Sequence, residues 1–146
     1  MPKLKTKLPS ASVTVKTEVV CPNDTNPMGM LQGGQLVHWM DIAAAVCAQV
    51  NAEKICVTAS IDSMNFRAPA KVGDIITIQA KITRAFMSSM EIWVRAWGKN
   101  VTCKESTLLS EAYFTFVALD NDTTPAKLPA LKPETEEEKE QYEEAL

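Results

Sequence analysis

The pattern of apolar and polar residues divides the chain into one helical segment and several strands. Residues 34–51 are rich in Ala, Leu and Met and contain no proline, so they predict a helix of about 27 Å. Apolar side chains cover nearly its whole circumference, which is typical of a buried helix. Alternation over residues 13–20 predicts a strand before the helix. β-Branched and aromatic residues predict four strands after it, at residues 55–66, 75–85, 89–97 and 106–118.

This order of elements predicts a single-domain α+β fold, with an antiparallel β-sheet wrapped around one long central helix. We expect residues 1–12 to be a flexible N-terminal lead-in and residues 13–120 to form the folded domain. Residues 121–146 should form a linker and an acidic C-terminal tail. Residues 21–33 are dense in Pro, Asn, Asp and Gly, and they predict a loop that leads into the helix.

The charge distribution and the cysteines narrow the possible functions. Residues 1–130 hold eleven acidic and thirteen basic residues, so the net charge of −3 comes from the tail. The basic residues are scattered, and we therefore expect no nucleic-acid partner. The absence of a signal peptide and of any run of eighteen apolar residues predicts a cytoplasmic protein that does not bind membranes. The cysteines lack C-x-x-C spacing and His38 is the only histidine, so we expect no metal site.

Asp41 is a charged residue in the middle of the apolar helix. Small residues, among them Gly34 and Ala44, fall within about 60° of it on a helical projection and leave a groove beside the carboxylate. Burial of a carboxylate is costly unless the group is paired or hydrogen-bonded. Two interpretations stay open: a structural Asp bonded to a loop or a partner subunit, and a functional carboxylate.

The loop before the helix is a second candidate feature. Asn26, Gly29, Gly33 and Gly34 lead into the helix N-terminus, where N–H groups are unpaired and carry partial positive charge. Amides in that position can hold a carbonyl oxygen that becomes negative during attack. Glycines that only form a tight turn, with Asn26 as its cap, are the alternative. Asp41, close to this loop in the sequence, favours a site.

These residues resemble a known family. The segment 24–41, DTNPMGMLQGGQLVHWMD, resembles the signature of hotdog-fold acyl-CoA thioesterases, both the bacterial short-chain type and the cytosolic acyl-CoA hydrolases. Three further segments resemble that family in the same order: VTASIDSMNFRAPAKVGD, SSMEIWVRAW and AYFTFVALD. The similarity covers residues 13–120. Relatives often carry Gly and Arg where this chain has Phe86 and Met87, so the residues that hold the nucleotide end of coenzyme A stay open.

The resemblance implies a hotdog fold and the hydrolysis of acyl-CoA to a carboxylic acid and coenzyme A. It implies no separate cofactor, because coenzyme A is part of the substrate. It also implies subunits paired edge to edge, three dimers in a hexamer, and a site between subunits. Asp41 corresponds to the catalytic carboxylate and Asn26 to a polar loop residue from the opposing subunit, with Gly33 and Gly34 holding the carbonyl. The expected substrate contacts are Gly29, Gln32, Met64, Phe66, Arg67 and Ser89.

Several alternatives remain at this point. Asp41 could deprotonate a water molecule as a general base, or attack directly and form an anhydride. The chain could instead act on acyl carrier protein, which would require a basic docking surface, or bind acyl-CoA without catalysis. A dehydratase of this fold needs a His paired with an acid, and a serine hydrolase needs G-x-S-x-G. The sequence resembles neither arrangement.

Overall fold

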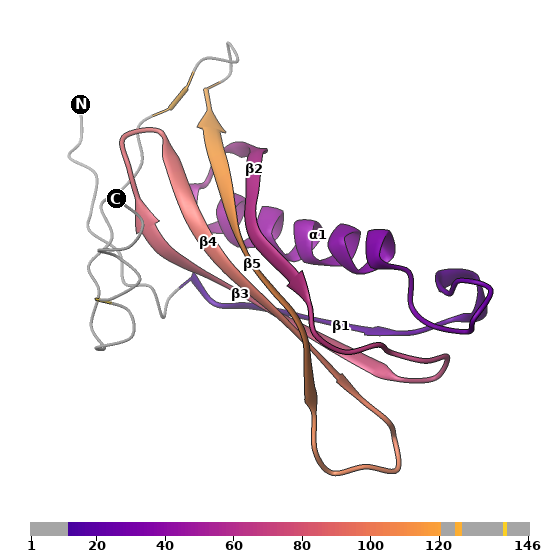
Figure 1. The fold of residues 1–146 in the computed structure, drawn as a ribbon. Helices are drawn as coiled ribbons and strands as arrows, with labels where there is room; N and C mark the ends of the chain where they lie inside the picture. The colour runs from indigo at the N-terminus through magenta and orange to yellow at the C-terminus, as the bar shows by residue number, and fades with distance from the viewer. Residues whose placement is uncertain (1–11, 121–124, 127–138, 140–146) are drawn as a thin grey trace.

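The computed structural model describes residues 12–120, 125, 126 and 139. Within these residues one long helix lies along the concave side of a curved five-stranded sheet (Figure 1). The elements, in chain order, are β1 (Thr14–Val19), the short 3-10 helix η2 (Pro22–Asp24), α1 (Gly33–Ala52), β2 (Ile55–Phe66), β3 (Ile75–Ala85), β4 (Ser89–Lys99) and β5 (Thr107–Leu119). The predicted α+β architecture and each predicted element are confirmed, with bounds that agree within two residues.

The strand order in the sheet is β1-β3-β4-β5-β2, and each neighbouring pair is antiparallel. The strands β3, β4 and β5 are neighbours in the sheet in the same order as in the chain, whereas β1 and β2 lie at opposite edges of the sheet. The helix that separates β1 from β2 in the sequence spans the width of the sheet between them (Figure 1). As a result β2, twelve residues long, leaves one backbone edge without a partner strand among the described residues.

The core forms where the inward side chains of β3, β4 and β5 meet α1. Every second residue on these strands is buried, as the alternation predicts. Phe114 and Phe116 on β5 and Met40 on α1 are among the largest fully buried side chains. Burial of each side chain of this size contributes roughly 1.5–3 kcal/mol, so this layer holds the helix in a fixed position on the sheet.

The helix is buried on one face only, and the expectation of burial around its circumference is wrong for a single chain. Trp39, Met40 and Ala44 pack on the sheet, but Ile42 is 36% exposed, Val46 42% and Val50 71%. A sheet of five strands can cover only one side of a cylinder. On β2, Ile61 faces the same side of the sheet as α1 and is also exposed, whereas the exposed Ile55 and Val57 alternate with the inward Cys56 and Thr58 and lie on the outer face.

The helix ends at a residue with left-handed backbone geometry. Glu53 has φ 56° and ψ 34°, and its N–H donates to the carbonyl oxygen of Gln49 over 2.8 Å. This turn reverses the chain so that β2 begins two residues later and runs back under α1. Among the described helices, none is long and apolar enough to cross a membrane.

Candidate functional site

The loop between η2 and α1 is built around the side chain of Asn26. Its Oδ1 accepts hydrogen bonds from the backbone N–H groups of Met28 (2.9 Å) and Met30 (3.2 Å). Gly29, at φ +78°, closes the turn by donating its N–H to the carbonyl oxygen of Asn26. Since N–H groups only donate, the accepting atom must be the amide oxygen, and this fixes the orientation of the side chain. The Nδ2 group is left as a donor with no acceptor among the described residues.

The N-terminus of α1 follows this loop and has no side-chain cap. Gln32, the residue before the helix, is held by two bonds: its N–H donates to the Asp24 carbonyl over 2.9 Å, and its Nε2 donates to the Thr25 carbonyl over 3.0 Å. Gly33 and Gly34 are exposed, and their N–H groups have no acceptor in the described part of the chain. The helix therefore presents free amides and the positive end of its dipole beside Asn26.

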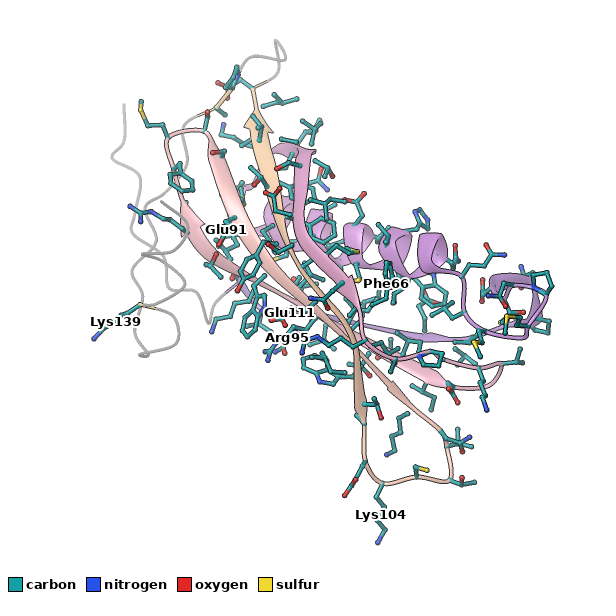
Figure 2. All side chains as sticks on the ribbon, in the orientation of Figure 1. Phe66, Glu91, Arg95, Lys104, Glu111 and Lys139 are labelled. Carbon is teal, nitrogen blue, oxygen red and sulfur yellow. The ribbon has the colours of Figure 1, made fainter. Side chains whose placement is uncertain are left out.

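A pocket of about 350 Å³ opens next to this helix end. Asn26 and Gly33 line it together with Phe66 and Arg67 from the end of β2. A side chain on Gly33 would meet the Phe66 ring, since an added Cβ would lie 3.4 Å from Cζ. Figure 2 shows Phe66 on the side of the sheet that carries α1. The rest of the lining is mainly apolar and includes Leu31, Leu36 and Leu109, which suits an apolar ligand group with a polar end.

Asp41 lies elsewhere, in the middle of α1 and against the edge strand β2. Its Oδ1 accepts a hydrogen bond of 2.8 Å from the Thr58 hydroxyl, and its side chain is half-buried. Thr58 is the functional candidate that sequence reasoning missed. Thr58 lies seventeen residues after Asp41 in the sequence, so no local pattern connects them. Thr58 faces the helix because it pairs with Phe116, an inward residue of β5.

Asp41 and the glycine loop do not meet within one chain. Eight residues of helix separate Gly33 from Asp41, which corresponds to about 12 Å along the axis. Neither Asp41 nor Thr58 lines the pocket. A single chain therefore holds the candidate residues in two separate places, called half-sites below: one with free donors and an apolar pocket, and one with the carboxylate.

The remaining predicted contacts divide between these half-sites and other places. Phe66 and Arg67 reach the pocket, and Met64 packs against the core. Gly29, Gln32 and Gly34 belong to the loop and the helix end without lining the pocket. Ser89 begins β4 next to the inward-facing Met90, so it lies on the outer face of the sheet and away from both half-sites within one chain.

Arg67 lines the pocket, but its guanidinium is held on the outer face of the sheet, because its partner Glu111 lies between the inward-facing Ser110 and Ala112. Its Nε donates to Asn65 Oδ1 over 3.1 Å, and its Nη2 donates to Glu111 Oε2 over 3.0 Å. The Glu111 carboxylate is itself fixed by a hydrogen bond from the Trp93 indole N–H. The Nη1 group of Arg67 keeps both donors without an acceptor among the described residues. A half-exposed guanidinium of this kind suits an anionic ligand group.

The buried thiols are poor candidates for nucleophiles. Burial raises the pKa of Cys47 to about 11, and its Sγ donates to the Ser12 carbonyl over 3.0 Å. Burial also raises the pKa of Cys56. Because the thiolate is the reactive form, both groups are inert near neutral pH. No cluster of three or more His, Cys, Asp or Glu side chains suited to a metal ion occurs within the described residues.

Comparison with known proteins shows which family has this sequence and fold. Residues 28–104 match the thioesterase superfamily. The uncharacterized acyl-CoA thioester hydrolase YkhA of Bacillus subtilis is 36% identical over 134 residues, which cover 92% of this chain and 78% of that protein. A crystal structure of an apo-hexameric acyl-CoA thioesterase is 38% identical with a TM-score of 0.93, covering 97% of this chain and 91% of that one.

A second solved structure is the acyl-CoA hydrolase of Staphylococcus aureus in complex with butyryl coenzyme A, coenzyme A and coenzyme A disulfide. It is 38% identical with a TM-score of 0.88, and the match covers 96% of this chain and 85% of that one. Structures of the same hydrolase include variants in which an Asp, an Asn and a Thr are each replaced by Ala. The chain belongs to the thioesterase superfamily, and its sheet and central helix form the hotdog fold.

Proposed function

We propose that this protein hydrolyses acyl-CoA thioesters, with Asp41 as the catalytic group. The observation that carries the proposal is the Asp41 carboxylate, held by Thr58 on an otherwise apolar helix beside an open strand edge. The similarity to acyl-CoA thioester hydrolases supports the substrate class. The products are a carboxylic acid and coenzyme A, so the reaction needs only water as a second substrate.

The spacing of three residues supports these roles. In the S. aureus hydrolase, the Asn and the Asp that were replaced by Ala lie 15 residues apart, and the Asp and the Thr lie 17 residues apart. Asn26, Asp41 and Thr58 have the same separations in this chain. We therefore assign Thr58 to the site in addition to the two residues that the sequence motif indicates.

The complete site requires two chains. The exposed apolar residues of α1 lie on the side of the helix that the sheet does not cover, and Ile61 of the edge strand β2 is exposed on the same side of the sheet. Antiparallel pairing of two β2 strands about a twofold axis near Asp62, midway between Thr58 and Phe66, would place Thr58 opposite the partner subunit's Phe66. The Asp41 of one subunit would then face the partner subunit's Gly33, and each dimer would hold two equivalent sites. The hexameric neighbours support a trimer of such dimers.

The reaction follows from the groups that this dimer assembles. The thioester oxygen accepts hydrogen bonds from Asn26 Nδ2 and from the free amides of Gly33 and Gly34. Asp41, from the other subunit, takes a proton from a water molecule while the oxygen of that water attacks the carbonyl carbon. The C–S bond then breaks and coenzyme A leaves as a thiolate. Because a thiol of this type has a pKa of about 8.5, departure needs little acid assistance. Direct attack by Asp41 is the second route, which forms an anhydride that water then cleaves.

Thr58 acts as a positioning residue for Asp41. Its hydroxyl occupies one lone pair of Oδ1 and restrains rotation of the carboxylate, so the other oxygen stays aimed across the interface.

Arg67 is proposed to bind the phosphates at the nucleotide end, in place of the basic residue that relatives often carry near position 87. We also propose a cytoplasmic location, because the four cysteines are unpaired, as expected in a reducing compartment.

The first prediction concerns Asp41. Asp41→Asn should lower kcat for acyl-CoA about 100-fold or more while the oligomer still forms, because the variant keeps the shape and loses the base. Release of free thiol measures kcat, and light scattering measures the assembly. Retention of near wild-type turnover would refute the proposed mechanism. Equal turnover on acyl carrier protein and acyl-CoA would favour the carrier-protein alternative.

The second prediction tests whether the site lies between subunits. Asn26→Asp keeps an oxygen that accepts from Met28 and Met30 and replaces the Nδ2 donor by a negatively charged carboxylate oxygen, so the loop should persist while activity falls. Co-expression of Asp41→Asn with Asn26→Asp should restore about a quarter of the wild-type activity. Half of randomly formed twofold dimers are mixed, and each mixed dimer holds one intact site of two. Absence of any restored activity in verified mixed oligomers would place the site within one chain.

The third prediction isolates the Thr58 hydroxyl. Thr58→Val preserves the shape and removes the donor, and it should lower kcat about 10–100-fold with KM nearly unchanged, since a hydrogen bond to a charged group is worth roughly 1.5–3 kcal/mol. Thr58→Ser keeps the hydroxyl and should stay within about threefold of wild type. Steady-state kinetics of both variants provide the measurement. A Ser variant as poor as the Val variant would indicate a packing role instead.

The fourth prediction concerns Arg67. Arg67→Gln should raise KM for acyl-CoA about tenfold, as expected when one charge-assisted hydrogen bond is lost. KM for the matching acyl-pantetheine, which lacks the nucleotide phosphates, should not change. The truncated substrate is the control, because damage to the pocket would affect both substrates equally. An equal rise in both KM values would remove Arg67 from phosphate recognition.

A further inference from the structure

A β-bulge aims one leucine of β5 into the pocket. Along the β4–β5 ladder, Ala96 pairs with Ser110 but Trp97 pairs with Leu108, so Leu109 is the extra residue at the register shift. Such bulges redirect a side chain that simple alternation would place on the other face. Ser110 already faces inward as a fully buried residue, and Leu109 joins it on that side as part of the core and of the pocket wall.

Gly98 on β4 provides the space that the Leu109 side chain occupies. A Cβ at Gly98 would lie 2.9 Å from Leu109 Cδ1, 3.1 Å from Cδ2 and 3.2 Å from Cγ. Atoms at the first of these separations overlap, so no other residue fits at position 98 while Leu109 keeps its place. Gly98 does not itself line the pocket. The Leu109 side chain therefore lies between Gly98 and the cavity, withdrawn from the cavity as far as a glycine allows.

The backbone around Leu109 is fixed as well. Its carbonyl oxygen accepts a hydrogen bond of 2.8 Å from the backbone N–H of Arg67. The next residue, Ser110, donates from its hydroxyl to the carbonyl oxygen of Asn65 over 2.6 Å. These bonds tie the bulge to the end of β2 that supplies Phe66 and Arg67 to the same pocket. Leu109 is 2% exposed, so its side chain is packed on nearly all sides, and it also forms part of the pocket lining.

We propose that Leu109, set back by Gly98, is the residue that determines how long an acyl chain the pocket accepts. The inference rests on the proposed function, because it identifies this apolar pocket as the acyl half of the site. Asn26 and Gly33 hold the carbonyl at the polar side of the cavity, and the acyl chain extends along the apolar lining to which Leu109 belongs. Removing or advancing the Leu109 side chain changes the space left for the last carbons of the chain.

The experiment compares kcat/KM over a series of saturated acyl-CoA substrates from two to sixteen carbons. Leu109→Ala should raise the ratio of long-chain to short-chain kcat/KM about tenfold or more, since one methylene group in an apolar pocket changes discrimination about 10–200-fold. Gly98→Ala should lower the same ratio by a similar factor by pushing Leu109 into the pocket. The double variant Gly98→Ala/Leu109→Ala should recover the long chains that Gly98→Ala excludes.

Leu108→Ala is the matched control. It removes the same atoms one position earlier, outside the pocket, and it should leave the chain-length profile unchanged. Binding constants for the same substrates in the Asp41→Asn background, measured by calorimetry, test the pocket without turnover and should shift in the same directions. Thermal unfolding of each variant verifies that it is folded.

The outcomes separate the two proposals. Wild-type hydrolysis with an unchanged profile in folded Leu109→Ala would overturn the role of Leu109 and leave the proposed function intact. A shifted profile in Leu108→Ala as large as that in Leu109→Ala would also overturn it. Absence of wild-type hydrolysis across the series would refute the proposed function, and the binding series would still decide whether Leu109 limits chain length.

Discussion

Coverage of α1 by the sheet on one side only is the constraint on which the rest of the structure depends. Five strands bury Trp39, Met40 and Ala44, and they leave Ile42, Val46 and Val50 in contact with solvent in a single chain. Apolar surface of this extent beside an open strand edge is the kind that subunits bury on association. In the dimer proposed above, association would also solve a chemical problem, because it would place the carboxylate of one chain against the free amides of another.

In the proposed dimer, division of the site between two chains would have an electrostatic consequence. Asp41 is half-buried and held by a single hydroxyl, so in one chain it remains partly hydrated. Closure of the interface removes water from this carboxylate at the place where it must take a proton, and fixed donors act more strongly in a dry site than in water. The positive end of α1, with no capping side chain, is reserved for the substrate oxygen and is not neutralised by the protein itself.

The pocket depends on a few positions where a side chain is absent. Gly33 brings the Phe66 ring against the first turn of the helix, and Gly98 allows Leu109 to withdraw from the cavity. At Gly98 the space of the missing Cβ is used by a side chain of another strand, whereas at Gly33 an added Cβ would only contact the Phe66 ring, 3.4 Å away. The shape of the cavity therefore depends on how β2, β4, β5 and α1 come together, and Figure 2 shows Phe66 and Glu111 on strands that are adjacent in the sheet but distant in the chain.

The sequence by itself determined the elements and half of the chemistry. Apolar periodicity predicted α1 and every strand, since local patterns of 3.6 and 2 residues need no knowledge of distant partners. A charged Asp41 among apolar residues, and the glycines before the helix, identified both half-sites. Residues 1–11 and nearly all of the tail lie outside the described residues, so the predictions made for them stay predictions. The tertiary structure decided that α1 has an open face, that Thr58 accompanies Asp41, that the predicted substrate contact Ser89 lies on the outer face of the sheet, and that a bulge turns Leu109 into the pocket. Each of these depends on strand pairing between residues far apart in the chain, and a sequence pattern does not specify which distant residues will face each other.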